Sequence, residues 1–436
     1  MIKLCANFLG TSEKFAGALF EFLVLALYAT DMRILAIETS CDETSFSLVQ
    51  VTQMHADATR IKADKEGKYI LPIVTVEKNL VASQIKLHAP FGGVVPTLAK
   101  REHIKNLPIL WRQMQKIKEV KNKEIDLLAV TVGPGLEPAL WTGIQFAQEI
   151  HETYFKKSIP LVGANHLEGH LYSFLLAEKT EFPIFPSSRT KFTTGGSNFQ
   201  FSIKSETQNL KKEKTTNHLF PMISLIVSGG HTILGVLHSL TKYEKLGETV
   251  DDAVGESFDK VARLLGLPYP GGALIEQLAQ EGNKEAIQFP RPMIHQKNYN
   301  FSYAGLKTAV LYYLRSQGVN VDNYSPSAVF KKKKIPIQLQ KDISASFQEA
   351  AFAPLVAKVA RAAQEYQAQT VCVGGGVAAN KKLSELLQVA LPQATVIVPP
   401  LMYCQDNAAM IALAAGIRHQ SSQNMYPLQA DGTMNL

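Results

Sequence analysis

A strand–turn–strand unit occurs twice in this chain, and this repeat constrains the fold more than any other feature. In the first copy, the apolar segment 34–37 leads through a polar turn into a second apolar segment at 46–49. In the second copy, segment 223–227 leads through the tight turn 228–231 into a returning strand at 232–236. Mixed strand and helix sequence follows each copy, so the repeat predicts a duplicated α/β fold. A nucleotide would bind in the cleft between two such halves.

The length of 436 residues exceeds one ordinary hydrophobic core and predicts two or more domains. Segment 15–29 is mostly apolar, but it is too short to span a bilayer and contains Glu21. We therefore expect the functional chain to begin at Met32, with a short amphipathic surface helix as the alternative for the preceding residues. The expected parts are an N-terminal extension at 1–31, an N-terminal lobe at 32–163, a C-terminal lobe at 164–418 with an insertion at about 178–217, and a tail at 419–436.

Charge and cysteine usage bound the function only loosely. The net charge of +7 permits a polyanionic partner without requiring one. The four cysteines form no C-x-x-C pair, which argues against a zinc ribbon or a disulfide framework and fits a cytoplasmic protein with no membrane partner. Stretch 178–217 and the lysine run 331–334 are expected to be solvated loops, with nucleic-acid contact as the alternative.

Glycine-rich turns that follow strands or open helices indicate a phosphate-binding cleft. Glycine lets the backbone approach a phosphate closely, and helix N-termini supply N–H donors. Segment 374–379 also matches the dinucleotide pattern G-x-G-x-x-A, but the next strand, 395–398, is followed by a proline pair instead of an acidic residue. The sequence also has no P-loop pattern, so turns from both halves would hold a nucleotide. These turns are at 133–135, 228–230, 271–272 and 374–376.

Two further segments carry polar side chains at helical spacing. A helix predicted at 251–265 carries Asp252, Glu256 and Asp259 on one face, which is typical of a solvated helix surface. Beside a nucleotide cleft, Asp259 would instead accept a hydrogen bond from a ribose or substrate hydroxyl. His166 and His170 also share one helical face, within reach of one metal ion.

The two histidines gain significance from a lone aspartate far downstream, Asp406. Two imidazoles and one carboxylate would leave coordination positions open for substrate, which suits Fe(II) or Zn. Taken alone, the H-x-x-x-H spacing also fits capping or surface histidines on an ordinary amphipathic helix.

Motifs along most of the chain resemble those of a single family. They lie at 37–44, 88, 92–96, 101–103, 165–170, 227–232, 258–260, 269–272, 305–308, 374–380 and 406–407. In this order they are similar to the motifs of the tRNA N6-adenosine threonylcarbamoyltransferases, formerly called O-sialoglycoprotein endopeptidases. The resemblance covers roughly residues 32–418. The chain departs from the family at Glu137-Pro138 and Trp141-Thr142, where smaller apolar residues are usual, and at the 178–217 insertion.

The resemblance implies an actin-like, Hsp70-like and hexokinase-like (ASKHA) fold of two lobes with duplicated RNase H-like domains. It implies an acyltransferase that moves a threonylcarbamoyl group from threonylcarbamoyl-adenylate to N6 of the tRNA adenosine at position 37. This adenosine lies next to the anticodon, in tRNAs that read codons starting with A. The implied partners are tRNA, a paralogous subunit of the same fold and a small P-loop ATPase subunit.

The resemblance also assigns roles to individual residues. His166, His170 and Asp406 would hold one divalent metal ion in the C-terminal lobe, with Fe2+ preferred over Zn2+. A carboxylate from Asp42 or Glu43 would orient or deprotonate the attacking amine, or both would only shape the cleft. The threonylcarbamoyl-adenylate would be bound by Ile226, Val227, Ser228, Gly229, Gly230, Asp259, Gly272 and Asn380.

Three other functions are compatible with parts of the sequence: a metalloprotease, a small-molecule kinase and a noncatalytic scaffold subunit. A metalloprotease would use H-E-x-x-H, but Leu167 follows the first histidine. A small-molecule kinase of the same fold class would use the cleft for ATP and would not need the histidine pair. A noncatalytic scaffold subunit would share the fold, but the intact set of two histidines and Asp406 argues against it.

Overall fold

The computed structural model describes residues 31–52, 72–176, 219–319 and 335–436. The expected insertion at 178–217, the lysine run 331–334 and residues 1–30 of the expected extension lie outside the described residues. In the part of the chain that is described, no helix is long and apolar enough to cross a membrane.

The first sheet contains five described strands in the order β3-β2-β1-β4-β5. β2 pairs antiparallel with β1 and β3, whereas β4 runs parallel to β1 and β5. The central segments 34–37 and 127–130 are apolar throughout because helices cover both faces of the sheet. The strands are β1 (Met32–Glu38), β2 (Glu43–Thr52), β3 (Ile73–Ser83), β4 (Leu127–Gly133) and β5 (Leu161–Asn165).

The second sheet repeats this arrangement, with β8-β7-β6-β9-β10 in the corresponding places. β7 is antiparallel to β6 and β8, whereas β9 is parallel to β6 and β10. The predicted duplicated α/β fold is therefore confirmed in the pairing of the strands. The strands are β6 (Met222–Val227), β7 (Thr232–Ser239), β8 (Lys242–Glu248), β9 (Thr370–Gly374) and β10 (Thr395–Ile397).

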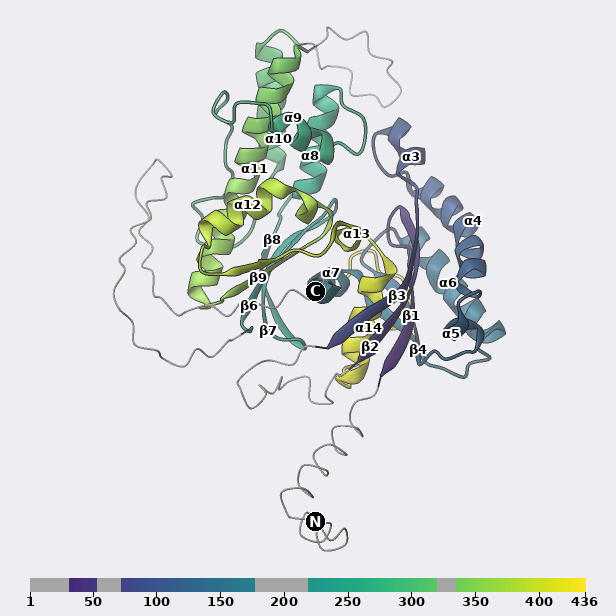
Figure 1. Cartoon of the computed structure of the whole chain (residues 1–436). Helices are drawn as coiled ribbons and strands as arrows, with labels where there is room; N and C mark the ends of the chain where they lie inside the picture. The colour runs from purple at the N-terminus through teal and green to yellow at the C-terminus, as the bar shows by residue number, and fades with distance from the viewer. Residues whose placement is uncertain (1–30, 53–71, 177–218, 320–334) are drawn as a thin grey trace, which may run out of the picture.

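Helices cover the outer face of each sheet (Figure 1). Beside the first sheet, Trp111 of a helix packs with Phe46 in one buried cluster. Beside the second sheet, the larger cluster includes Phe258, Phe347 and Phe352. The covering helices are α4 (Pro96–Met114), α6 (Glu137–Thr153), α8 (Val254–Leu265), α9 (Gly272–Ala279), α10 (Ala304–Ser316), α11 (Ile337–Glu365) and α12 (Lys381–Ala390).

Two helices, α7 (His166–Tyr172) and α14 (Ala408–Gln420), lie between the sheets (Figure 1). Their apolar side chains share one buried cluster with residues of both sheets, which is why residues 408–417 of α14 are all buried. Gly169 permits the two helices to approach closely, since a Cβ there would lie 2.9 Å from Met410 Cγ. The lobe boundaries expected near 163 and 418 stay a prediction.

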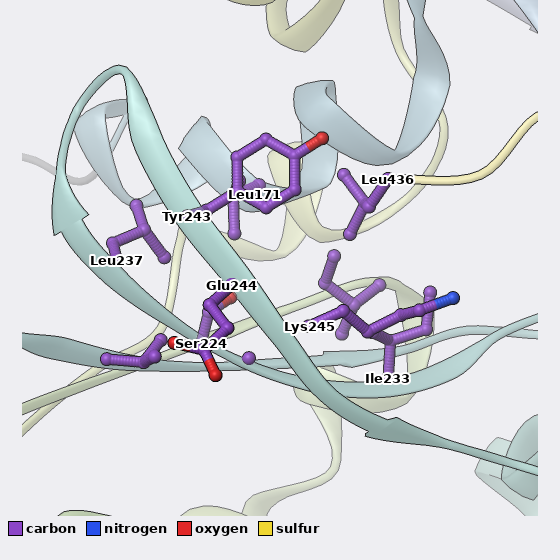
Figure 2. A pocket seen from close by; sticks show the side chains of 11 residues that line it. Leu171, Ser224, Ile233, Leu237, Tyr243, Glu244, Lys245 and Leu436 are labelled. Carbon is purple, nitrogen blue, oxygen red and sulfur yellow. The ribbon is translucent and has the colours of Figure 1, made fainter. Parts of the chain in front are cut away.

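The residues after α14 turn back along the first sheet. Tyr426 forms a bridge with Gly163 of β5, and the Asp431 N–H donates to the Val132 carbonyl oxygen at 2.8 Å. Leu436 reaches the inter-sheet layer, where it lines a pocket with Leu171 and residues of the second sheet (Figure 2). The remaining short elements are α3 (Ile85–His88), η1 (Ala89–Phe91), α5 (Lys118–Lys121), η2 (Ser173–Leu176), η3 (Gly376–Ala379) and α13 (Leu401–Cys404).

Candidate metal centre and nucleotide cleft

The two histidines are placed by the junction of β5 and α7. Asn165 ends β5, and its side-chain oxygen accepts hydrogen bonds from the backbone N–H groups of Leu167 and Glu168, at 2.8 and 3.3 Å. This cap starts the helix at His166, so His170 follows one turn later on the same face. Both histidines are buried.

Asp406 meets the two histidines from the other inter-sheet helix. It precedes Asn407, whose side chain caps α14. Asp406 Oδ1 lies 3.4 Å from His166 Nε2 and 3.2 Å from His170 Nε2. One ligand atom from each of the three residues lies within 4.8 Å of the others, a spacing that one metal ion can bridge. The structure thus brings together residues that are far apart in the sequence.

A second carboxylate, Glu38, fixes the orientation of His166. Its Oε2 lies 3.1 Å from His166 Nδ1 and accepts a hydrogen bond from Thr131 Oγ1 at 2.6 Å, while Oε1 accepts one from the Ser40 N–H. Ser40 Oγ also lies 3.1 Å from His166 Nδ1. Holding Nδ1 in this way leaves Nε2 facing Asp406 and His170, as in carboxylate–histidine–metal arrangements. No role for Glu38 or Ser40 was predicted from the sequence, although both lie in the 37–44 motif.

The charges around the histidines favour a cation at this place. Burial lowers the pKa of His166, but the carboxylates of Asp406 and Glu38 outweigh it and raise the pKa to about 10. The Asp406 carboxyl is also buried, yet His166 holds its pKa well below the usual range. Burial lowers the pKa of His170. The neighbouring carboxylates therefore stabilise one positive charge at this place, whether a proton on His166 or a metal cation.

His170 supplies an independent test of whether these residues fit a metal. Among the described residues, neither of its buried ring nitrogens has a hydrogen-bond partner, although Nε2 lies close to Asp406. Buried polar atoms are normally satisfied, and a bound ion would satisfy the His170 nitrogen that lies 3.2 Å from Asp406 Oδ1. The donor set of two histidines and one aspartate therefore fits a divalent transition metal.

The Ser228–His231 turn lies beside this centre. The Ser228 N–H donates to the His231 carbonyl oxygen at 2.8 Å, and the His231 N–H donates to Ser228 Oγ at 3.1 Å, which fixes the turn. Burial and the nearby histidines lower the pKa of His231 to about 4, so this side chain is neutral. A Cβ on Gly229 or Gly230 would meet no atom of the described chain within 4 Å. The turn predicted to bind the adenylate therefore presents open backbone next to the metal centre.

Asp259 occupies a different position from the one expected of a solvated carboxylate. Its Oδ1 accepts a hydrogen bond from the Gly271 N–H at 2.7 Å, next to Gly272 at the start of α9, and burial raises its pKa. The expected helix at 251–265 was wrong at its start, because α8 begins only at Val254. Asp252 still lies beside Glu256, since Lys260 pairs with both carboxylates, at 2.7 and 2.9 Å.

Asn380 and the glycine turn at 133–135, both predicted to line the cleft, make contacts within the protein. The side chain of Asn380 caps α12 by accepting from the Lys382 N–H at 2.9 Å, and its amide donates to Gln348 Oε1 at 2.9 Å. At the 133–135 turn, the tail takes the space expected for a phosphate, since a Cβ on Gly133 would collide with the Asp431 carbonyl oxygen. This glycine serves close backbone packing.

Asp42 and Glu43 are both buried, and they lie near the ends of β1 and β2, close enough to Asp406 for its charge to act on Glu43. Burial, together with the charges of Asp42 and Asp406, raises the pKa of Glu43 to about 10. Ser83 Oγ donates to Glu43 Oε1 at 3.1 Å. Burial and the charges of Asp42 and Asp259 also raise the pKa of Tyr269. The Tyr269 hydroxyl is therefore close enough to feel carboxylates that follow both sheets.

Fold and site together define an α/β protein with two sheets of one topology, a candidate metal centre between the sheets and an open glycine turn beside that centre. A family model described as tRNA N6-adenosine threonylcarbamoyltransferase matches residues 75–192 and 202–413. A relative of that name from Fervidobacterium nodosum is 39% identical over 393 residues, which cover 90% of this chain and 95% of the relative. A relative from Bacillus subtilis is 37% identical over 390 residues, covering 89% and 90%.

The chain belongs to the tRNA N6-adenosine threonylcarbamoyltransferase family, and it is a transferase that modifies tRNA, as the motifs predicted. The expected α/β fold with a duplicated sheet is confirmed by the matching strand orders of the two sheets. Full-length HypF in a phosphate- and nucleotide-bound form is similar with a TM-score of 0.48 and 13% identity, over 91% of this chain and 48% of that chain.

Proposed function

We propose that this chain transfers the threonylcarbamoyl group from threonylcarbamoyl-adenylate to N6 of the adenosine at tRNA position 37, in tRNAs that read codons starting with A. The observation that carries the proposal is the convergence of His166, His170 and Asp406 beside the open Ser228–Gly230 turn. His166, His170 and Asp406 hold one divalent ion, and two imidazoles with one carboxylate favour Fe2+, with Zn2+ as the alternative. When bound, such an ion polarises the carbamoyl carbonyl and offsets phosphate charge.

The residues of the chain bind and orient the adenylate. Backbone groups from Ile226 to Gly230 line the site beside the metal centre, and the open backbone at Gly229 and Gly230 suits a phosphate or carbonyl oxygen. Asp259 accepts a hydrogen bond from a ribose hydroxyl, and Gly272 lies beside it at the start of α9, where a Cβ would meet no atom within 4 Å. Asn380 borders the site through its cap on α12.

The carboxylates of the first lobe act on the amine of tRNA. Burial and the charges of Asp42 and Asp406 raise the pKa of Glu43 to about 10, so Glu43 keeps a proton at neutral pH. Asp42 accepts a proton or hydrogen bond from the attacking N6 amine, and AMP then leaves. The chain works in the cytoplasm with a paralogous subunit of the same fold and a small P-loop ATPase subunit.

The test is formation of threonylcarbamoyladenosine on tRNA from threonylcarbamoyl-adenylate, with candidate partner subunits added and the nucleosides separated by liquid chromatography and mass spectrometry. The wild-type chain is expected to modify tRNA, while the His166→Ala/His170→Ala chain loses both its metal and this activity. A chain that phosphorylates a small metabolite and leaves tRNA unmodified would establish the kinase alternative instead.

A further inference from the structure

We propose that the segment 421–436 positions the metal-binding helix α7, with Arg418 and Tyr426 as positioning residues that act through Glu168. This inference rests on the metal site of the proposed function. The segment begins beyond residue 413, where the match to the family model ends, so the family motifs assign it no role. Four sets of contacts carry the inference.

The first contact holds α7 from behind its ligand face. Glu168 lies between the two histidines in the sequence, and two residues of helix turn it away from them. Its buried carboxylate accepts hydrogen bonds from Arg418 Nη2 at 2.6 Å and from the Tyr426 hydroxyl at 3.0 Å. Arg418 Nη2 also donates to the Tyr426 hydroxyl at 2.7 Å, and its guanidinium lies 4.1 Å from the centre of the Tyr426 ring. Charge-assisted bonds of this kind fix geometry strongly when the carboxylate is buried.

The second contact fixes the start of α7. Asn165 uses its side-chain oxygen to cap the helix, and it uses its amide nitrogen to donate to the Asn435 carbonyl oxygen at 2.9 Å. The residue immediately before His166 is therefore held by the segment. The helix is restrained at its cap and again at Glu168.

The third contact is apolar and lies near the end of α7. Leu436 and Leu171 line the same small pocket against the second sheet (Figure 2). Leu436 also packs against the buried cluster between the sheets, which contains Leu167 and Leu171.

The fourth contact reaches His166 by another route. The Gly432 carbonyl oxygen accepts a hydrogen bond from the Gly135 N–H at 3.4 Å. The neighbouring Leu136 N–H donates to the Ser40 carbonyl oxygen at 2.7 Å, and Ser40 Oγ lies 3.1 Å from His166 Nδ1. One segment thus supports both the helix that carries the histidines and the turn that orients His166.

The inference is tested with Tyr426→Phe in the full chain, which removes the hydroxyl and keeps the ring beneath Arg418. Metal-free protein is titrated with Co2+, and the affinity and the visible d–d spectrum are recorded. We expect Co2+ binding to weaken by about tenfold and the spectrum to change, since supporting contacts outside the ligand set typically change metal affinity by about 10–100-fold. Glu168→Gln serves as a second variant and should also weaken Co2+ binding.

The chain supplies a matched control in Tyr299→Phe. The Tyr299 hydroxyl donates to Glu365 Oε2 at 2.6 Å, and the Arg361 guanidinium lies 4.3 Å from the ring, so the same three residue types meet on the outer side of the second lobe. This variant should lose stability to urea to a similar extent and keep wild-type Co2+ affinity and spectrum. Wild-type Co2+ binding in both Tyr426→Phe and Glu168→Gln would overturn the positioning role. A wild-type chain that binds no metal would instead refute the metal site itself, and the inference with it.

Discussion

Glu38 Oε2 and His166 Nδ1 lie 3.1 Å apart, although Glu38 ends the central strand β1 and His166 follows the edge strand β5. Both strands end at the same side of the sheet because β1, β4 and β5 run parallel, and their last residues therefore face the metal centre. The carboxylate keeps the imidazole in the tautomer that presents Nε2 to an ion.

Glu38→Gln should therefore weaken metal binding by about 10–100-fold, because the amide holds the ring without a negative charge. Isothermal titration of the metal-free protein with Co2+ measures the change. Glu77→Gln is the control: Glu77 accepts from Arg33 Nε at 3.0 Å at a site outside the metal centre, so its loss should leave Co2+ affinity unchanged. Equal affinities in wild type and Glu38→Gln would show that His166 needs no carboxylate.

Removal of His166 or His170 should abolish the metal, since either change leaves only two ligands. Elemental analysis of the purified chains should find about one metal ion per wild-type chain and almost none in the double alanine variant. His238→Ala provides the control, because this histidine pairs with Glu244 at 3.4 Å on β7 and β8. Unchanged metal content in the double variant would contradict the assignment.

Asp259→Asn should reduce transfer by about 10–100-fold while the metal content stays constant, since a hydrogen bond to a charged group contributes about 1.5–3 kcal/mol. Asparagine keeps an acceptor for the Gly271 N–H, whereas Asp259→Ala loses it and should also unfold more easily, by about 1 kcal/mol. Urea denaturation and the tRNA assay separate the two effects. Full activity in Asp259→Asn would place the adenylate elsewhere, and joint loss of activity and metal would make Asp259 a ligand.

Glu43 should make the metal-free protein less stable as the pH rises. Its folded pKa of about 10 exceeds the ordinary value of 4.5, so between these values the folded state keeps a proton that the unfolded state has released. The free energy of unfolding then falls with pH, by up to about 1.4 kcal/mol per pH unit for one such group. Urea denaturation at pH 5, 6.5 and 8 measures the slope. Glu43→Gln should flatten it, and an identical slope in that variant would assign the proton to another group.

Removal of residues 1–31 should leave folding and activity intact. β1 begins at Met32, which pairs with Val51 of β2, and the Arg33 N–H donates to Asp126 Oδ2 at 2.8 Å. A chain that starts at Met32 should match the full chain in solubility, urea midpoint and tRNA modification. Insolubility or inactivity of the shorter chain would show that the N-terminal residues contribute to the fold.

The sequence predicted those features that depend on local spacing. The four-residue interval between His166 and His170 was sufficient for a shared helical face, and the repeated strand–turn–strand unit was sufficient for two sheets of one topology. The start of α8 was misplaced because a distant side chain helps to set it: the Val254 N–H donates to Thr232 Oγ1 at 2.9 Å. Local helical periodicity contains no information about that contact.

The role of the tail could not be predicted for a related reason. Many of its contacts use backbone atoms, such as the Asp431 N–H and the Asn435 carbonyl oxygen, which any residue type provides. Glu38 was missed because its importance depends on His166, which approaches it only in the folded chain. The same limit applies to Gly133, whose missing side chain accommodates Asp431 in place of a phosphate.

The position of the metal ligands along the chain has a mechanical consequence. His166 and His170 follow β5, the last strand of the first sheet, whereas Asp406 follows β10, the last strand of the second, and immediately precedes the helix that packs against the first. The candidate ligands therefore lie where the chain leaves the first sheet and where it later returns to it. Hinge rotations between two halves take place about such connecting segments. Rotation about such a pivot displaces the distant rim of the cleft far more than the ligands. A hinge rotation that widened the cleft would therefore leave His166, His170 and Asp406 close together.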